Sequence, residues 1–152
     1  MKKYITLILL LFFTIISCEK DDICIDETTP SLIFRFYNND NPTEFKQINL
    51  DSVWVEGKNK IEEYVNFSLD SIAIPIDLNH NKTTYILENN SIKDTITFNY
   101  VRSDIFVSRS CGYKTIFEDF QAESNTTNWI KNISINNSTI DNETAAHISI
   151  FH

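Results

Sequence analysis

Glycine, proline and histidine are scarce in this chain of 152 residues, which holds two glycines, three prolines and three histidines. Two glycines are too few for a phosphate-binding loop or a nucleophile elbow, and neither motif occurs. The histidines (His80, His147 and His152) have neither H-x-H nor H-E-x-x-H spacing, and no cysteine pair accompanies them. The sequence therefore predicts no metal site and no cofactor, and His147 is expected on a strand surface.

Basic residues are also a minority, with 13 Lys and Arg against 21 Asp and Glu, a net charge of −8. Because no basic run occurs, nucleic acid is excluded as an expected partner. Adjacent carboxylates such as Glu62-Glu63 and Glu118-Asp119 arise freely in an acidic chain, and acid–base catalysis needs carboxylates that face each other across a cleft. We therefore expect no enzymatic activity, with a hydrolase as the least favoured alternative.

The only long apolar run lies at the start, where Lys2 and Lys3 precede the 13 residues Tyr4–Ile16. A membrane-spanning helix needs about 20 residues, whereas this run fits the core of a cleavable signal peptide. It ends in two isoleucines before Ser17-Cys18, which resembles the lipobox of bacterial lipoproteins. The resemblance implies cleavage between Ser17 and Cys18 and acylation of Cys18, as with palmitate, which anchors the protein in a membrane. A plain signal peptide and an uncleaved anchor are the alternatives.

The residues after Cys18 are charged. Within Glu19-Lys20-Asp21-Asp22, the order of Lys20, Asp21 and Asp22 resembles the surface-export signal of outer-membrane lipoproteins in some Gram-negative bacteria. The resemblance implies an outer-membrane protein exposed at the cell surface. The alternative is a solvated tether on a protein that faces the periplasm.

The chain divides into three expected parts: a cleaved signal peptide (1–17), a lipidated acidic tether (18–30) and one folded domain (31–152). Loss of two lysines with the signal leaves 135 residues, 11 of them basic and 21 acidic, with a net charge of −10. This length is typical of a single domain. Since anionic lipid would repel such a chain, the lipid must do the anchoring.

Two cysteines remain once Cys18 is acylated, Cys24 and Cys111. Outside the cytoplasm an even number of cysteines favours a disulfide, and this one would hold the tether to the folded domain. Two free thiols are the alternative.

Short runs rich in β-branched and aromatic residues, separated by turn residues, predict an all-β domain, a single antiparallel sandwich of the immunoglobulin-like kind. A four-residue turn at 101–104 is expected to join two of these strands in a hairpin. Weak helical patterns occur at 58–67 and 115–121, and 124–142 is expected to be partly irregular. The expected strands are Leu32–Tyr37, Ser52–Glu56, Ser71–Ile74, Thr83–Glu88, Asp94–Tyr100, Ile105–Arg109, Trp129–Ile135 and His147–Phe151.

Most aromatic residues lie in these runs and are expected in the core, although one or two exposed rings would suit stacking on a sugar or a peptide.

Three Asp-Ser/Thr-aliphatic triplets resemble the acceptor of a bacterial O-glycosylation system, which implies Ser52, Ser71 and Thr95 as acceptors. The alternative is that Asp-Ser/Thr simply begins a strand after a turn.

The ordered blocks resemble an uncharacterised family of small lipoproteins, a domain of unknown function. The likeness runs from Cys18 to about Phe120 and implies an extracytoplasmic lipoprotein domain without catalytic residues. It is carried by Asn41–Phe45, Asp70–Pro75, Asp94–Tyr100, Val107–Gly112 and Cys24.

We therefore expect a lipid-anchored outer-membrane protein with a structural or protein-interaction role in the cell envelope. The alternative is a carbohydrate- or peptide-binding module at the cell surface. The expected partners are the membrane, through the lipid, and other envelope proteins or glycans.

Overall fold

The computed structural model describes residues 23–24 and 28–152. Its secondary structure is ten strands and one 3₁₀ turn, with no α-helix in the part described. The elements are β1 (Leu32–Tyr37), β2 (Ile48–Leu50), β3 (Ser52–Val55), η1 (Glu62–Tyr64), β4 (Phe67–Leu69), β5 (Ser71–Ile74), β6 (Lys82–Asn89), β7 (Ile92–Ser108), β8 (Gly112–Asn125), β9 (Asn132–Ile135) and β10 (Ile148–Phe151).

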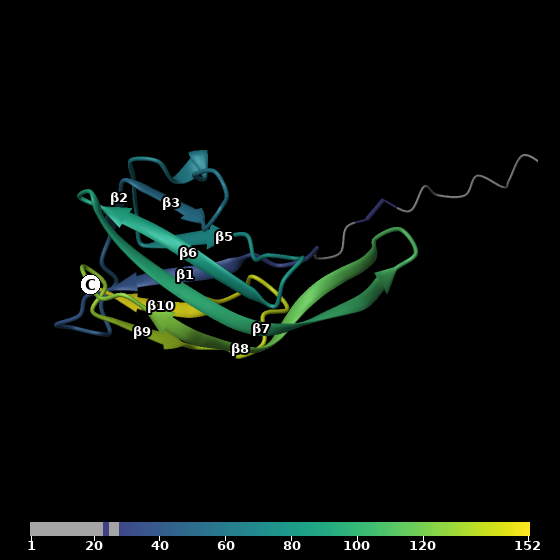
Figure 1. Cartoon of the computed structure of the whole chain (residues 1–152). Helices are drawn as coiled ribbons and strands as arrows, with labels where there is room; N and C mark the ends of the chain where they lie inside the picture. Colours follow the sequence, from purple (N-terminus) through teal and green to yellow (C-terminus); the bar gives the residue numbers. More distant parts are fainter. Residues whose placement is uncertain (1–22, 25–27) are drawn as a thin grey trace, which may run out of the picture.

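The strands form three sheets, none of them closed. A mixed sheet has the order β5-β1-β10-β9, an antiparallel sheet has the order β3-β6-β7-β8, and β2 pairs with β4. The two four-stranded sheets lie against each other as layers, and the far halves of β7 and β8 extend beyond them (Figure 1). The expectation of an all-β domain is confirmed.

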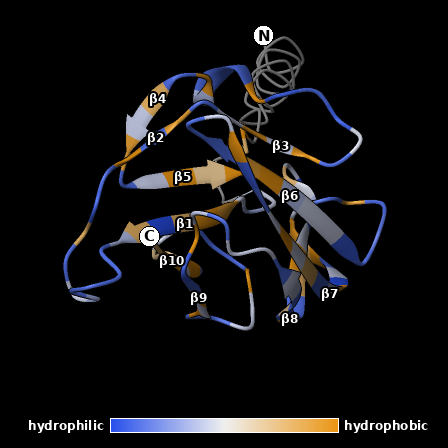
Figure 2. Ribbon diagram, turned by 60° about the vertical axis from the view of Figure 1, so that its left-hand side comes forward, coloured by the Kyte–Doolittle hydropathy of each residue, from blue (hydrophilic) through white to orange (hydrophobic). Residues whose placement is uncertain are grey.

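One hydrophobic core joins the two layers, and strand β1 shows how the sequence builds it. Its residues alternate between buried and partly buried, as the period of a half-buried strand requires. Phe34, which is fully buried, contacts Tyr85 of β6 at a ring-centroid distance of 5.6 Å and Phe98 of β7 at 6.1 Å. Hydrophobic and hydrophilic residues alternate along several strands in Figure 2. The layers are therefore held together chiefly by apolar burial.

The expected hairpin turn at 101–104 is wrong. Strand β7 runs without interruption through these residues, and the chain turns at 109–111 before β8. Gly112 has a φ of +73°, a left-handed conformation that suits glycine. The register of β7 on β8 shifts at three places, which lets one long strand bend without a turn. The hairpin therefore spans residues 92–125.

The expectation of purely antiparallel pairing is also wrong, because β1 and β10 are parallel, with Phe34 opposite Ile148 and Phe36 opposite Ile150. These strands are the first and the last in the sequence, and the long chain between them allows either direction of pairing. Strands β2 and β4 were not expected. The weak helical pattern at 115–121 belongs to β8. The one at 58–67 contains η1 and the first residue of β4.

His147 is buried, with 2 % of its surface exposed, and not on a strand surface as expected. Its Nδ1 accepts a hydrogen bond from the backbone N–H of Ile33 at 3.0 Å, so Nε2 donates to the carbonyl of Asn142 at 2.9 Å. Burial lowers the pKa of His147. The neutral ring therefore joins the start of β1 to the loop before β10.

Candidate functional site

The long hairpin extends beyond the two layers as an arm, residues 101–116. Cys24 and Cys111 are bonded to each other across 87 residues of sequence, with their Cα atoms 4.9 Å apart. This is the disulfide expected from the sequence, and it ties the chain before β1 to the turn at the end of the arm. Ser17, Cys18, Lys20, Asp21 and Asp22, with the rest of the expected signal and most of the tether, lie outside the described residues.

Further hydrogen bonds hold the arm to the residues that precede β1 and to the C-terminal loop. The backbone N–H of Thr115 donates to Oγ1 of Thr29 at 2.9 Å. The Nζ of Lys114 donates to the carbonyl of Asp141 at 2.9 Å. At the base of the arm, Nε of Arg102 donates to Oδ1 of Asn81 at 2.8 Å. The direction of the arm is thus fixed by contacts at its base, along its length and at its tip.

The three expected glycosylation acceptors differ in accessibility. Ser52 is fully buried and donates to a carboxylate oxygen of Glu88 at 2.8 Å, so its hydroxyl is inaccessible in the folded protein. Ser71 is partly buried and donates to the carbonyl of Phe34 at 3.1 Å. Thr95 is partly buried in β7. The alternative reading of the triplets fits two of them, because Ser52 and Ser71 are the first residues of β3 and β5.

The outer face of the mixed sheet carries a group of aromatic rings. On β1, Arg35 and Tyr37 are partly exposed and alternate with the buried Phe34 and Phe36, so they point away from the core. Phe45, which is 52 % exposed, follows β1 and packs beside them: its ring centroid is 5.1 Å from that of Tyr37 and 4.1 Å from Cζ of Arg35. Phe151 of β10 lies 5.5 Å from Tyr37 on the other side.

Arg35, Tyr37 and Phe45 border a groove of about 370 Å³, which the loop 143–146 also lines. Arg35 lies 3.9 Å from the carboxylate of Asp70, and both side chains are partly exposed, so this ion pair neutralises the guanidinium only weakly. Flat rings with one cation suit a sugar ring or an acidic peptide. We call this the aromatic groove.

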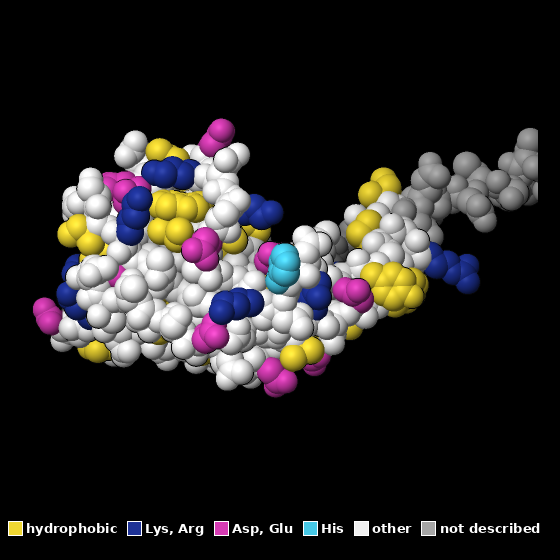
Figure 3. All heavy atoms as spheres, viewed as in Figure 1, with side chains coloured by type: hydrophobic (Ala, Val, Ile, Leu, Met, Phe, Trp, Pro, Cys, Tyr) yellow, Lys and Arg dark blue, Asp and Glu magenta, His cyan; other side chains and the backbone are white. Residues whose placement is uncertain are grey.

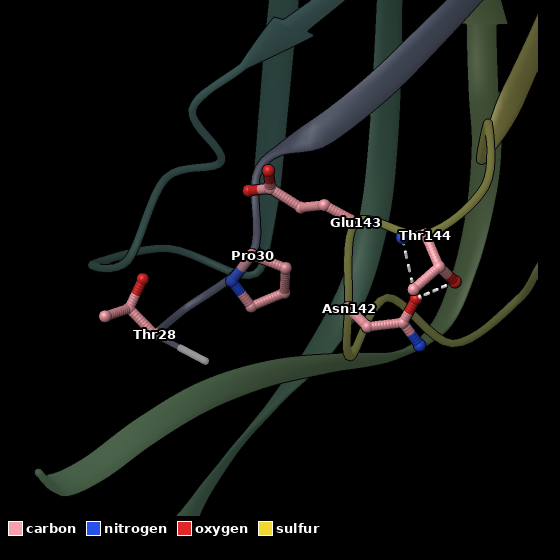
Figure 4. Close-up of a pocket in the computed structure, with 5 residues that line it drawn as sticks. All are labelled: Thr28, Pro30, Asn142, Glu143 and Thr144. Carbon is pink, nitrogen blue, oxygen red and sulfur yellow. Dashed lines mark hydrogen bonds between the residues drawn. The ribbon is translucent and has the colours of Figure 1, made fainter. Parts of the chain in front are cut away.

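A second hollow, of about 340 Å³, lies between the residues before β1 and the loop before β10 (Figure 4). Its polar side chains are engaged in holding the backbone. Oε1 of Glu143 accepts the N–H of Ser31 at 2.6 Å, and Oδ1 of Asn142 accepts the N–H of Thr144 at 3.0 Å. The first bond joins the start of the domain to its C-terminal part and the second holds the loop 142–144, so we assign this hollow a structural role.

Trp54 lies on the outer face of the antiparallel sheet between two lysines. Nζ of Lys60 is 5.0 Å and Nζ of Lys93 is 5.4 Å from its ring, and Lys60 also lies 3.0 Å from Glu88. The hydrogen bond from Lys60, assisted by the one from Ser52, lowers the pKa of Glu88. The ring is thus covered by side chains that are already paired.

Asp94 is the most highly connected buried carboxylate described. It is 0 % exposed, and its two oxygens accept the hydroxyl of Thr126 at 2.6 Å and the N–H groups of Asn128, Trp129 and Ile130, each at 2.8 Å. Burial alone would raise the pKa of Asp94, but these four hydrogen bonds together lower it. Asp94 thereby fixes the turn that carries the chain from β8 towards β9. The sequence indicated this residue only as the start of the expected strand Asp94–Tyr100 and as part of an Asp-Thr-Ile triplet, not as a buried carboxylate.

Within residues 23–24 and 28–152, no three His, Cys, Asp or Glu side chains are grouped so that they could hold a metal ion. No helix in this part of the chain is long and apolar enough to cross a membrane.

Comparison with known proteins gives one match. Neither the curated proteins nor the solved structures contain a match. A family model matches residues 49–152, which include all strands from β3 to β10. It therefore begins later than the likeness drawn from the sequence and reaches further towards the C-terminus. Since it covers more than half of the chain, the chain belongs to the family of unknown function DUF6452.

Proposed function

We propose that this chain is a lipoprotein of the Gram-negative outer membrane, anchored by acyl groups on Cys18, with a structural or protein-interaction role in the cell envelope and no enzymatic activity. The observation that carries the proposal is the bond between Cys24 and Cys111. Disulfides persist in oxidising compartments outside the cytoplasm, where the signal at 1–17 would send the protein. Cys24 also lies only six residues after Cys18.

We further propose that the domain is a β-sandwich. The two packed four-stranded sheets and their shared core support this class. An immunoglobulin-like assignment has support from the size and the layers, whereas the parallel pairing of β1 with β10 departs from a purely antiparallel immunoglobulin-like sandwich.

Replacement of the lipidated cysteine tests the anchor. The Cys18→Ala variant should lose all labelling by radioactive palmitate and leave the membrane fraction, because no other residue offers the thiol that acylation needs at this site. Cys24→Ser is the matched control, since it removes a thiol six residues away and should keep full labelling. Palmitate labelling of Cys18→Ala at the level of the unaltered protein would refute the lipobox.

The motif Lys20-Asp21-Asp22 supports display at the cell surface. Protease added to intact cells distinguishes this orientation from one that faces the periplasm, because only a displayed domain is cut before the outer membrane is opened.

The aromatic groove supports a second function, binding of a sugar or a peptide at the cell surface. Phe45→Ala should weaken retention of the protein on insoluble peptidoglycan, chitin or cellulose by about 5- to 70-fold, the effect of about 1–2.5 kcal/mol expected for one exposed stacking ring. Phe67→Ala is the control, because Phe67 is similarly exposed (45 %) on the separate β2-β4 sheet. Equal retention of both variants would exclude this groove as the binding surface.

A further inference from the structure

The tip of the arm, residues 105–114, exposes large apolar side chains. Phe106 is 59 % exposed and Tyr113 is 71 % exposed, and the two are cross-strand partners whose ring centroids lie 5.4 Å apart. Ile105, on the other face, is 37 % exposed. In Figure 3 hydrophobic side chains gather towards the end of the arm, beside a basic one. The arm therefore carries, far from the core, side chains of the kind that the rest of the domain buries.

The segment from Cys18 to Cys24 limits how far the tip of the arm can lie from the membrane. Cys111 is bonded to Cys24, and Cys24 follows Cys18 by six residues. Six residues span at most about 22 Å when fully extended. A lipid on Cys18 would therefore confine Cys24 to within about 22 Å of the point where the chain leaves the bilayer. Cys111, whose Cα atom is 4.9 Å from that of Cys24, would lie within about 27 Å of the same point. Ile23, next to Cys24, is 79 % exposed.

The charge of the tip differs from that of the whole chain. Residues 105–114 contain Arg109 and Lys114 and no carboxylate, whereas the chain carries a net charge of −8. Arg109 is exposed in the turn, and Lys114 reaches back to the carbonyl of Asp141. A cationic turn beside exposed aromatic rings is the combination favoured at the boundary between lipid headgroups and acyl chains.

We propose that the arm tip inserts Phe106, Tyr113 and Ile23 into the interfacial layer of the lipid bilayer that holds the anchor. The inference rests on the lipid anchor proposed above. It assigns the arm a mechanical role, because the ten residues from Tyr100 to Arg109 span about 30 Å as a strand. The arm then holds the two-layered body, with its aromatic groove, about this far from the membrane.

Fluorescence quenching in vesicles tests the inference. The full-length lipidated protein is reconstituted in vesicles of phosphatidylethanolamine and phosphatidylglycerol whose acyl chains are brominated, and tryptophan emission is compared with that in unbrominated vesicles. Phe106→Trp should show strong quenching and a blue shift of the added emission. Phe45→Trp is the matched control, since Phe45 is almost equally exposed but lies next to Tyr37, at the end of β1 away from the arm. It should show no quenching beyond that of the unaltered protein.

Tyr113→Trp provides a second reporter in case the first variant misfolds, and flotation of the vesicles separates the two proposals. If the protein floats with the vesicles and neither reporter is quenched more than Phe45→Trp, the anchor stands and the membrane-docked tip is refuted. If the unaltered protein does not float, the anchor fails, and the inference that rests on it fails as well.

Discussion

Asp94→Ala is expected to destabilise the domain by about 3–5 kcal/mol, the range typical of breaking a buried network around a charge. The carboxylate accepts three backbone N–H groups and one hydroxyl from residues 126–130, all of which would lose their partner at once. Buried donors without acceptors are costly, and alanine supplies none. The predicted fall in melting temperature is roughly 10–20 °C for a domain of this size, measured by circular dichroism or calorimetry.

The loss should be local in origin, because Asp94 fixes the turn before β9. Ile130, whose N–H bonds to Asp94, is fully buried, and β9 pairs with β10. Hydrogen exchange in Asp94→Ala should therefore rise first in 126–135. Asp40→Ala is the control, since this aspartate is exposed in a loop and its removal should leave stability within about 0.5 kcal/mol. A loss in Asp94→Ala no larger than that would contradict the assigned role.

The stability of the domain should also fall at acid pH, because Asp94 takes up a proton there. Its pKa is lower in the folded protein than the ordinary value of 3.8, so the unfolded chain takes up a proton at a higher pH than the folded one. The stabilisation from Asp94 is therefore fully present above about pH 5 and is lost as the pH falls through 3.8 and then through the folded pKa. Asp94→Asn should flatten this part of the curve of stability against pH, measured by urea unfolding between pH 2 and 7.

Strands with a clear alternation were predicted from the sequence with useful accuracy, because burial of one face fixes a two-residue period that can be read locally. Leu32–Tyr37 and Ser71–Ile74 match β1 and β5 residue for residue. The error at 101–104 came from interpreting a short stretch with three polar residues, Arg102, Ser103 and Asp104, as a turn. Those residues contain no glycine, proline or asparagine, and the true turn ends at Gly112. Turn chemistry would have placed it correctly.

Among the candidate sites, only those that depend on the type of residue alone, such as the disulfide, could be predicted from the sequence. The chain has three cysteines, so once Cys18 was assigned to lipid attachment, only Cys24 and Cys111 remained to form a disulfide. The aromatic groove depends on long-range pairing, because the loop 143–146, just before β10, comes beside Arg35 and Tyr37 through the parallel register of β10 on β1. Neither spacing nor composition indicates that register. For the same reason Asp94 could not be distinguished from the other acidic residues, since its donors lie more than 30 residues later in the chain.

Removal of the disulfide in the Cys24→Ser, Cys111→Ser double variant is expected to lower stability by up to about 4–5 kcal/mol, the loop-entropy contribution for a bridge across 87 residues. That model counts only the freedom regained by the unfolded chain. The turn of the arm would also gain freedom in the folded protein, because the bridge joins Cys111 to the chain before β1. The measured loss in urea should therefore fall below the full figure.

Two readouts separate these contributions. The unfolding midpoint reports the whole domain, whereas limited proteolysis reports the arm, which without the bridge loses the covalent link between its turn and Cys24. We expect early cleavage near Arg109 in the double variant and protection of the same bond in the oxidised protein. The reduced unaltered protein is the matched control, since it lacks the bond but keeps both side chains, and it should behave like the double variant. If reduction leaves both the midpoint and the cleavage near Arg109 unchanged, the bridge does not hold the arm.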